Sequence, residues 1–121
     1  MNSARSANHI LKAAFWSLCI VIAILALVPQ DPMQQPLFAL GDKVVHALAF
    51  LILCLVGLYA YPTRLLSIAL LLIALGGGIE IAQGYVASRS QELADFYADL
   101  IGIAIAFGLC AARTMAKSSL D

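Results

Sequence analysis

Charged residues are scarce in this chain of 121 residues. Lys, Arg, Asp and Glu together make up 12% of it, whereas hydrophobic side chains make up 63%. A soluble domain of this size cannot hide so much apolar surface, so the composition indicates a membrane protein. The formal net charge is zero, and no clustered basic face of the kind that nucleic-acid binding needs is present. The scarcity of charge therefore excludes a nucleic-acid partner.

Cysteine is also sparse, and its spacing matches no metal or redox motif. Cys19, Cys54 and Cys110 each lie inside an apolar run and form no CxxC pair. Such cysteines are typically small core hydrophobes rather than ligands or disulfide partners. The first apolar run likewise lacks a small-x-small cleavage pattern near Val28 and Pro29. We interpret this run as a retained first span, not as a signal peptide.

Long apolar runs are what the sequence has in abundance. A helix of roughly 20 residues crosses a hydrocarbon core of ~30 Å, and we expect spans at residues 10–28, 44–61, 65–86 and 95–112. Residues 1–9 are polar and expected to be frayed, and the prolines of residues 29–41 predict a connector that breaks the helix. Residues 62–64 predict a tight turn between antiparallel neighbours. The sequence thus predicts an all-α, four-helix transmembrane bundle with short loops, forming one domain over residues 1–121.

Basic residues are distributed unevenly between the two sides of such a bundle. Five of them fall on the side of the termini and two on the other side. The five are Arg5, Lys12, Arg64, Arg113 and Lys117, and the two are Lys43 and Arg89. Because the side richer in basic residues faces the cytoplasm, we expect both termini to be cytoplasmic. Six of the seven acidic residues then lie at or toward the outer face.

Small residues predict close helix packing at two places. Ala98, Gly102 and Ala106 recur at intervals of four residues in the last span, which forms a ridge that favours tight contact. The third span carries glycines at residues 76–78, one turn before Glu80. We expect these glycines to permit close approach of a neighbouring backbone rather than to mark a bend.

Polar residues gather at the outer ends of the last three spans. A charged side chain in hydrocarbon costs several kcal/mol unless it is paired or hydrated, so these residues need a structural or functional reason. Asp42 and His46 lie one helical turn apart, as do Glu80 and Gln83, and likewise Asp95 and Asp99, so each pair shares a helix face. We expect one ligand-binding site built from Asp42, Lys43, His46, Glu80, Gln83, Arg89, Asp95 and Asp99.

Several interpretations of these residues remain open. Lys43 and Arg89 could bridge the acids simply to fix helix register, as a structural brace. A metal ion could bind the acids and His46, but only one His is present there and two cations compete for the acids, so we expect no metal and no cofactor. His46 and Glu80 are candidate catalytic residues, acting as acid and base. No Ser or Cys nucleophile is paired with a base, and the two cations suit an anionic ligand, so binding is the interpretation we favour.

The spacing of these residues also resembles a known family. The pattern Asp42-Lys43-x-x-His46-x-x-x-Phe50, then Glu80-x-x-Gln83-x-Tyr85-x-x-x-Arg89, then Asp95, is similar to that of the VanZ-like membrane proteins. The resemblance extends over nearly the whole chain. That family usually has Asn four residues after Asp95, where this chain has Asp99, and Gly102 matches the glycine three residues further on. The resemblance implies a small multi-pass protein of the bacterial cell membrane, in a family named for resistance to the glycopeptide teicoplanin. It implies no particular reaction.

These observations give a functional expectation. We expect a protein of the bacterial inner membrane that binds a polar or anionic headgroup of a cell-envelope component at the outer leaflet and contributes to envelope or teicoplanin tolerance. Its partner is then a membrane lipid or a lipid-linked envelope precursor, and a homo-oligomer is compatible with the sequence. One alternative is a membrane enzyme that acts on a lipid-linked or cell-wall precursor through a carboxylate and His pair. The other is a purely structural ion-pair brace.

Overall fold

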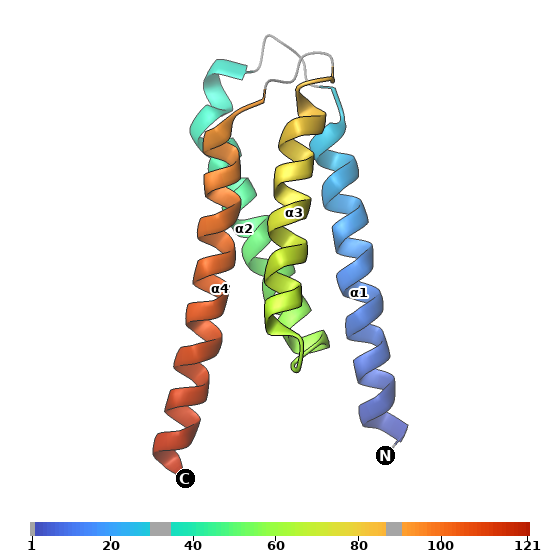
Figure 1. The fold of residues 1–121 in the computed structure, drawn as a ribbon, viewed down its shortest axis with the longest axis vertical. Helices are drawn as coiled ribbons and strands as arrows, with labels where there is room; N and C mark the ends of the chain where they lie inside the picture. Colours follow the sequence, from blue (N-terminus) through green and yellow to red (C-terminus); the bar gives the residue numbers. More distant parts are fainter. Residues whose placement is uncertain (1, 30–34, 87–90) are drawn as a thin grey trace.

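The computed structural model describes residues 2–29, 35–86 and 91–121. It contains four helices, α1 (Asn2–Leu27), α2 (Gln35–Ala60), α3 (Leu65–Gln83) and α4 (Leu93–Leu120), and no strand in the described part of the chain. The helices stand side by side, with both chain ends at the same end of the bundle (Figure 1). All four are long and apolar enough to cross a membrane. The predicted all-α architecture of four candidate membrane spans is therefore confirmed.

The first and last helices extend beyond the predicted spans. α1 begins at Asn2, so residues 2–9 are helical rather than frayed, and α4 continues to Leu120 instead of ending near residue 112. Every residue from 111 to 120 is exposed. The prediction was based on the length of the apolar runs. Helical hydrogen bonding, however, continues into the polar residues that flank these runs.

The bounds of the two middle helices also differ from the prediction. α2 already begins at Gln35, inside the segment that was expected to break the helix. Pro36 is its second residue, and a proline is tolerated there because the first N–H groups of a helix have no partner within the helix. α3 ends at Gln83, and the bond from Tyr85 N to Ala82 O (3.0 Å) belongs to the turn that follows it.

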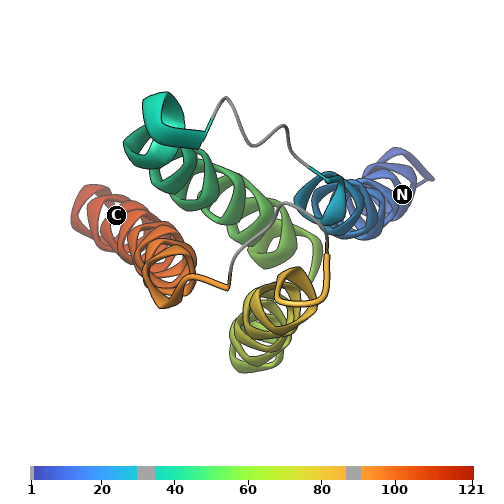
Figure 2. The ribbon, with the colours of Figure 1, turned by 90° about the horizontal axis from the view of Figure 1, so that it is seen from above.

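The helix α2 lies at the centre of the bundle. Viewed from above, it runs between α1 and α4, and α3 lies next to its lower end in this view (Figure 2). It contacts all three other helices and packs most extensively on α4, whereas α1 and α4 make no contact in the described part of the chain. The predicted tight turn between α2 and α3 is confirmed by the bond from Arg64 N to Tyr61 O (3.0 Å). Aromatic and aliphatic side chains, among them Phe15, Phe50 and Leu72, form the apolar core.

Close contact between α2 and α4 depends on the predicted ridge of small residues. Ala98, Gly102 and Ala106 are all buried. A methyl group added at Gly102 would overlap the carbonyl oxygen of Ala47 and lie 2.9 Å from the amide nitrogen of Leu51. The backbone of α4 therefore approaches that of α2 as closely as the absence of a side chain allows, and the prediction is confirmed.

The polarity of the bundle is reversed relative to a soluble protein. Large apolar side chains such as Ile20 (60% exposed) and Leu66 (72% exposed) point outward, whereas polar side chains such as Asp99 are buried. So many exposed apolar side chains are more favourable in contact with lipid acyl chains than in water. The distribution supports a multi-pass membrane protein.

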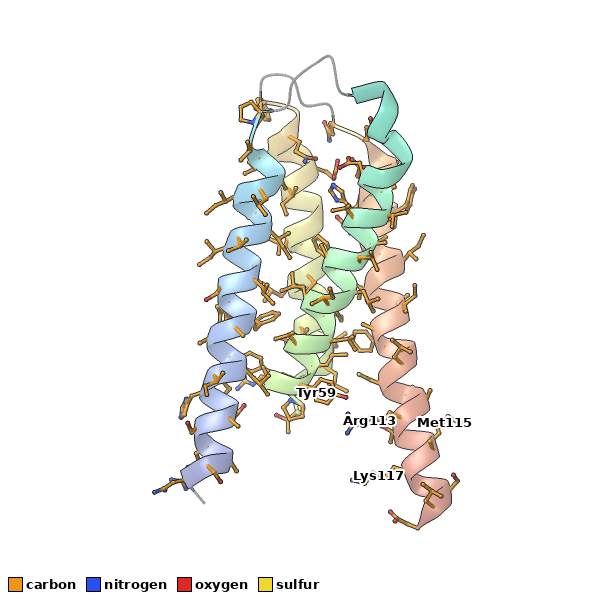
Figure 3. All side chains as sticks on the ribbon, turned by 180° about the vertical axis from the view of Figure 1, so that it is seen from behind. Tyr59, Arg113, Met115 and Lys117 are labelled. Atoms are coloured by element: carbon orange, nitrogen blue, oxygen red, sulfur yellow. The ribbon has the colours of Figure 1, made fainter. Side chains whose placement is uncertain are left out.

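Aromatic and basic side chains meet at the end that carries the termini. The Trp16 indole donates a hydrogen bond to the Tyr61 hydroxyl (2.9 Å), and the Lys12 ammonium lies 5.2 Å from the centre of the Tyr61 ring. Arg113 on α4 hydrogen-bonds to the Tyr59 hydroxyl, and Figure 3 shows the two residues at this lower end of the bundle. Such pairs of aromatic and basic residues are typical of a membrane–water interface.

Candidate functional site

The structure brings the predicted polar residues together at the end of the bundle opposite the termini. Five of them are buried: His46 (9% exposed), Glu80 (4%), Gln83 (1%), Asp95 (4%) and Asp99 (1%). Asp42 and Lys43 are partly exposed beside them on the first turns of the span in α2. Arg89, the eighth predicted site residue, lies outside the described residues. Seven residues from three helices thus lie at the same end of the bundle, and their role in ligand binding stays a prediction.

The centre of the site is a pair formed by His46 and Asp99. The imidazole Nδ1 of His46 on α2 is 3.0 Å from Oδ1 of Asp99 on α4, a hydrogen bond between two buried side chains. On the other side of the ring, Nε2 lies 3.9 Å from Oδ2 of Asp42. The helical spacing of Asp42 and His46 produces this second approach, as predicted. The ring is therefore placed between two carboxylates.

Lys43 lies at the rim and interacts with two acids at the start of α4, Glu92 just before the helix and Asp95 in its first turn. Its ammonium is 3.0 Å from Oε2 of Glu92 and 3.6 Å from Oδ1 of Asp95. The predicted bridge to Asp95 is therefore present, while Glu80 and Asp99 are held by other groups. Glu80 Oε2 accepts a hydrogen bond from the backbone N–H of Glu92 (3.2 Å).

Gln83 connects the site to α1. Its side-chain amide donates a hydrogen bond to the carbonyl oxygen of Ala26 (2.8 Å). Ala26 lies in the last turn of α1, where carbonyl groups have no partner within the helix. Gln83 therefore caps α1 from α3 and fixes the position of the first helix beside the site.

Four buried acceptor atoms have no hydrogen-bond partner among the described residues. They are Glu80 Oε1, Gln83 Oε1, Asp95 Oδ1 and Asp99 Oδ2. Buried polar atoms are normally satisfied, so unpartnered ones need an explanation. All four are acceptors, which indicates that the site lacks donors or positive charge rather than acceptors.

A glycine makes room for one of these acceptors. A methyl group added at Gly76 would lie 2.9 Å from Asp99 Oδ2, closer than ordinary side-chain contacts allow. By contrast, Gly77 has only an ordinary contact distance of 3.7 Å to Phe96, and Gly78 has no neighbour within 4 Å. The expected close approach of a neighbouring backbone is therefore wrong for these three glycines, because the close approach occurs at Gly76 alone and a side-chain carboxylate makes it.

A pocket of about 240 Å³ opens beside the cluster, between α1, α2 and α3. Its walls are mainly apolar, and its polar lining residues are Asp42 and His46. The apolar lining consists of Ile22, Leu25, Ala26, Val45, Ala49, Phe50 and Ile79. The pocket therefore joins an apolar wall to the polar cluster.

Two overlapping groups of side chains have the spacing of metal ligands. One ligand atom each from His46, Glu80 and Asp99 lies within 4.8 Å of the others, and the same holds for Asp42, His46 and Asp95. The candidate catalytic residues His46 and Glu80 thus share one of these groups. Their proximity makes acid and base chemistry geometrically feasible.

Reasoning from sequence missed three contributors. Glu92 pairs with Lys43 through its side chain and with Glu80 through its backbone, and its position three residues before Asp95 was the signal that could have identified it. Gly76 was grouped with its two neighbours, although it alone faces Asp99. The carbonyl of Ala26 carries no signal in the sequence, because any residue could supply it.

The site combines an oriented imidazole, buried acceptors and an adjoining apolar pocket. Such a combination suits recognition of a molecule with a polar and an apolar part. Comparison of the chain with protein-family models, with curated proteins and with solved structures finds no match.

Proposed function

We propose that this chain is a multi-pass membrane protein that binds the polar headgroup of a lipid or lipid-linked envelope component. The main observation behind this proposal is the pocket, whose wall is apolar along α1 and α2 and polar at Asp42 and His46. An amphiphilic ligand likewise has an apolar part and a polar part. Its headgroup would meet these two side chains while its hydrocarbon part follows the apolar wall.

The size of the pocket limits what it can enclose. About 240 Å³ is below the ~300–1,000 Å³ of pockets that enclose a whole small molecule. The pocket therefore suits a headgroup together with the first methylene groups of a chain. The rest of the chain would lie on the exposed apolar side chains of α1 and α2, such as Leu25 (62% exposed) and Val45 (62% exposed).

The polar groups favour a headgroup that carries hydrogen-bond donors. The Asp42 carboxylate lines the pocket and accepts hydrogen bonds, so hydroxyl or ammonium groups complement it. Lys43 at the rim supplies a positive charge for an anionic part of the same headgroup. A headgroup with both donors and an anionic part fits this arrangement best.

Orientation and biological role complete the proposal. The asymmetry of basic residues supports cytoplasmic termini, which would put the site at the outer leaflet of a bacterial inner membrane. The resemblance of the motifs around His46, Glu80 and Asp95 to VanZ-like proteins supports a contribution to envelope or teicoplanin tolerance. Binding of an envelope component at the outer leaflet is compatible with such a role.

A second candidate function is catalysis on the same kind of ligand. The observation that favours it is the His46 imidazole, which is held at Nδ1 by the buried Asp99 and also lines the pocket. A histidine oriented by a carboxylate is a common general base. Substituting Gln for His46 would then retain the bound component but stop turnover of a labelled lipid-linked precursor.

The proposed binding is tested by filling the pocket without changing a polar residue. Ala49 lines the pocket, and Ala74 is an exposed residue of α3 outside its lining. We expect mass spectrometry of protein extracted with its native membrane to show one lipid class enriched over the bulk membrane. Ala49→Leu should abolish that enrichment, and Ala74→Leu should keep it. Equal lipid composition around both variants and the bulk membrane would contradict the proposal.

A cellular measurement accompanies the biochemical one. In a strain that lacks the native gene, Ala74→Leu should restore teicoplanin tolerance to the level given by the unmodified chain, while Ala49→Leu should not. Restoration by both variants would separate the tolerance phenotype from the pocket.

A further inference from the structure

We propose that His46, Glu80 and Asp99 bind one divalent transition-metal ion of the Mn²⁺ or Zn²⁺ type. The three side chains come from α2, α3 and α4, and one ligand atom of each lies within 4.8 Å of the others. Two ligand atoms at ~2.1 Å from one ion are at most ~4.2 Å apart. Side-chain movements of under ~1 Å therefore suffice to bring the three ligand atoms to coordination distance. The fold therefore brings a nearly formed ligand set together.

The charge of the cluster calls for a cation. Glu80 and Asp99 are 4% and 1% exposed, and each carboxylate keeps one oxygen that has no hydrogen-bond partner among the described residues. Buried carboxylates are costly unless they are paired with a positive charge or coordinate a metal. Lys43 lies beside Glu92 and Asp95, at 3.0 and 3.6 Å. A divalent ion would compensate the two deeper carboxylates.

The free oxygen of Asp99 is directed toward the helix that carries Glu80. Asp99 Oδ2 would lie 2.9 Å from a methyl group added at Gly76, so it faces α3 at that residue. Glu80 follows Gly76 by four residues and shares its helix face. The absence of a side chain at Gly76 thus leaves space for the Asp99 carboxylate directly beside Glu80.

The environment of His46 matches that of a metal ligand. Nδ1 lies on the side of Asp99, at 3.0 Å, and Nε2 lies 3.9 Å from the Asp42 carboxylate. A ligating histidine usually has its second ring nitrogen directed toward a carboxylate, which orients the ring. One nitrogen and two carboxylate ligands suit Mn²⁺ or Zn²⁺, and three protein ligands leave coordination positions open.

This inference goes beyond the proposed lipid binding and does not require it. Ion binding depends on the buried triad, whereas lipid binding depends on the pocket wall. Ala49→Leu should therefore leave ion binding unchanged, which makes failure of one proposal distinguishable from failure of the other. If both are correct, the ion would add positive charge beside the pocket and favour an anionic headgroup.

The first measurement is a calorimetric titration of Mn²⁺ and Zn²⁺ into full-length protein in detergent, produced without a histidine tag and treated with a chelator. We expect saturation at one ion per chain. Glu80→Gln and Asp99→Asn should each weaken binding by about tenfold or more, since loss of even an outer-shell partner has effects of about 10- to 100-fold. Asp121→Asn is the control, because it removes an exposed carboxylate after the end of α4, away from the triad, and it should bind as tightly as the unmodified chain.

The second measurement reports on His46 in the unmodified fold. Electron spin-echo spectroscopy of the Mn²⁺-loaded protein should detect a directly bound imidazole nitrogen, which His46→Gln removes. The chain has two histidines, so His9→Gln, in an exposed position of α1, should keep the signal. The proposal is overturned if neither ion saturates, if Glu80→Gln and Asp99→Asn bind as tightly as the unmodified chain, or if no nitrogen coupling is found. The absence of nitrogen coupling would overturn the proposal even if a carboxylate variant does not fold.

Discussion

At the scale of single residues, the contacts of His46 and Asp99 separate a structural brace from a binding site. The two side chains form a buried hydrogen bond of 3.0 Å between α2 and α4. Leaving one member of such a pair without its partner costs the desolvation energy of that group, whereas replacing both by apolar side chains can be neutral. Single and double substitutions therefore answer different questions.

We expect Asp99→Leu to lower the free energy of unfolding by about 1–3 kcal/mol, because it leaves the His46 imidazole buried without its hydrogen bond. The double variant His46→Leu with Asp99→Leu should recover most of that loss. Unfolding in mixed detergent micelles, followed by circular dichroism, measures both. A double variant as unstable as the single one would show that the two residues do not act as a pair.

The same double variant also tests function. If the cluster serves only to brace the helices, a stable double variant should retain lipid enrichment and teicoplanin tolerance. If the cluster is a binding site, both should be lost while the fold is kept. A structural brace therefore predicts that the double variant keeps both its stability and its function. A binding site predicts that it keeps its stability and loses its function.

At the scale of helices, the contact between α2 and α4 dominates the packing. Helices in a membrane gain little from hydrophobic burial, so close packing of small residues carries much of their association. Gly102 lies against the backbone of α2 at Ala47, whereas Gly108 in the same helix has no neighbour within 4 Å of an added methyl group. These two glycines form a matched pair for an experiment.

We expect Gly102→Ala to destabilise the bundle by about 1–3 kcal/mol, since the added methyl group must push the two backbones apart. Gly108→Ala should leave the free energy of unfolding unchanged or raise it by up to about 1 kcal/mol, because alanine is the better helix former and its methyl group displaces no neighbour. Unfolding of both variants under identical detergent conditions compares them directly. Equal stabilities would mean that α2 and α4 do not pack through Gly102.

At the scale of the whole molecule, the topology places the polar site and the termini at opposite ends of the bundle (Figure 1). The basic residues described near the termini, including Lys12 and Arg113, lie beside the aromatic side chains of Tyr61 and Tyr59. Such contacts are typical of a membrane–water interface. If this end faces the cytoplasm, as the count of basic residues predicts, the site faces the outside.

The orientation can be measured by labelling single cysteines in sealed spheroplasts. In a chain whose three native cysteines are replaced by alanine, we expect a membrane-impermeant maleimide to label Gln91→Cys near the site. Ser118→Cys, near the other end of the bundle, should react only after the membrane is opened. Labelling of both positions from the same side would rule out the four-span topology.

The sequence by itself determined the number of helices and the faces on which their polar residues lie. The four apolar runs were long enough to predict four spans, and the spacing of four between Asp42 and His46, or between Asp95 and Asp99, placed each pair on one face. These are local properties, set by the length of a helix and its 3.6-residue period. They hold whatever the neighbouring helices do.

The tertiary structure alone decided which of these residues meet. It paired His46 with Asp99 and Lys43 with Glu92, and it directed Gln83 to the carbonyl of Ala26. It also distinguished Gly76 from the glycines that follow it. Such contacts depend on the rotation, tilt and depth of each helix relative to the others, which follow from packing over the whole bundle and from no pattern within one helix.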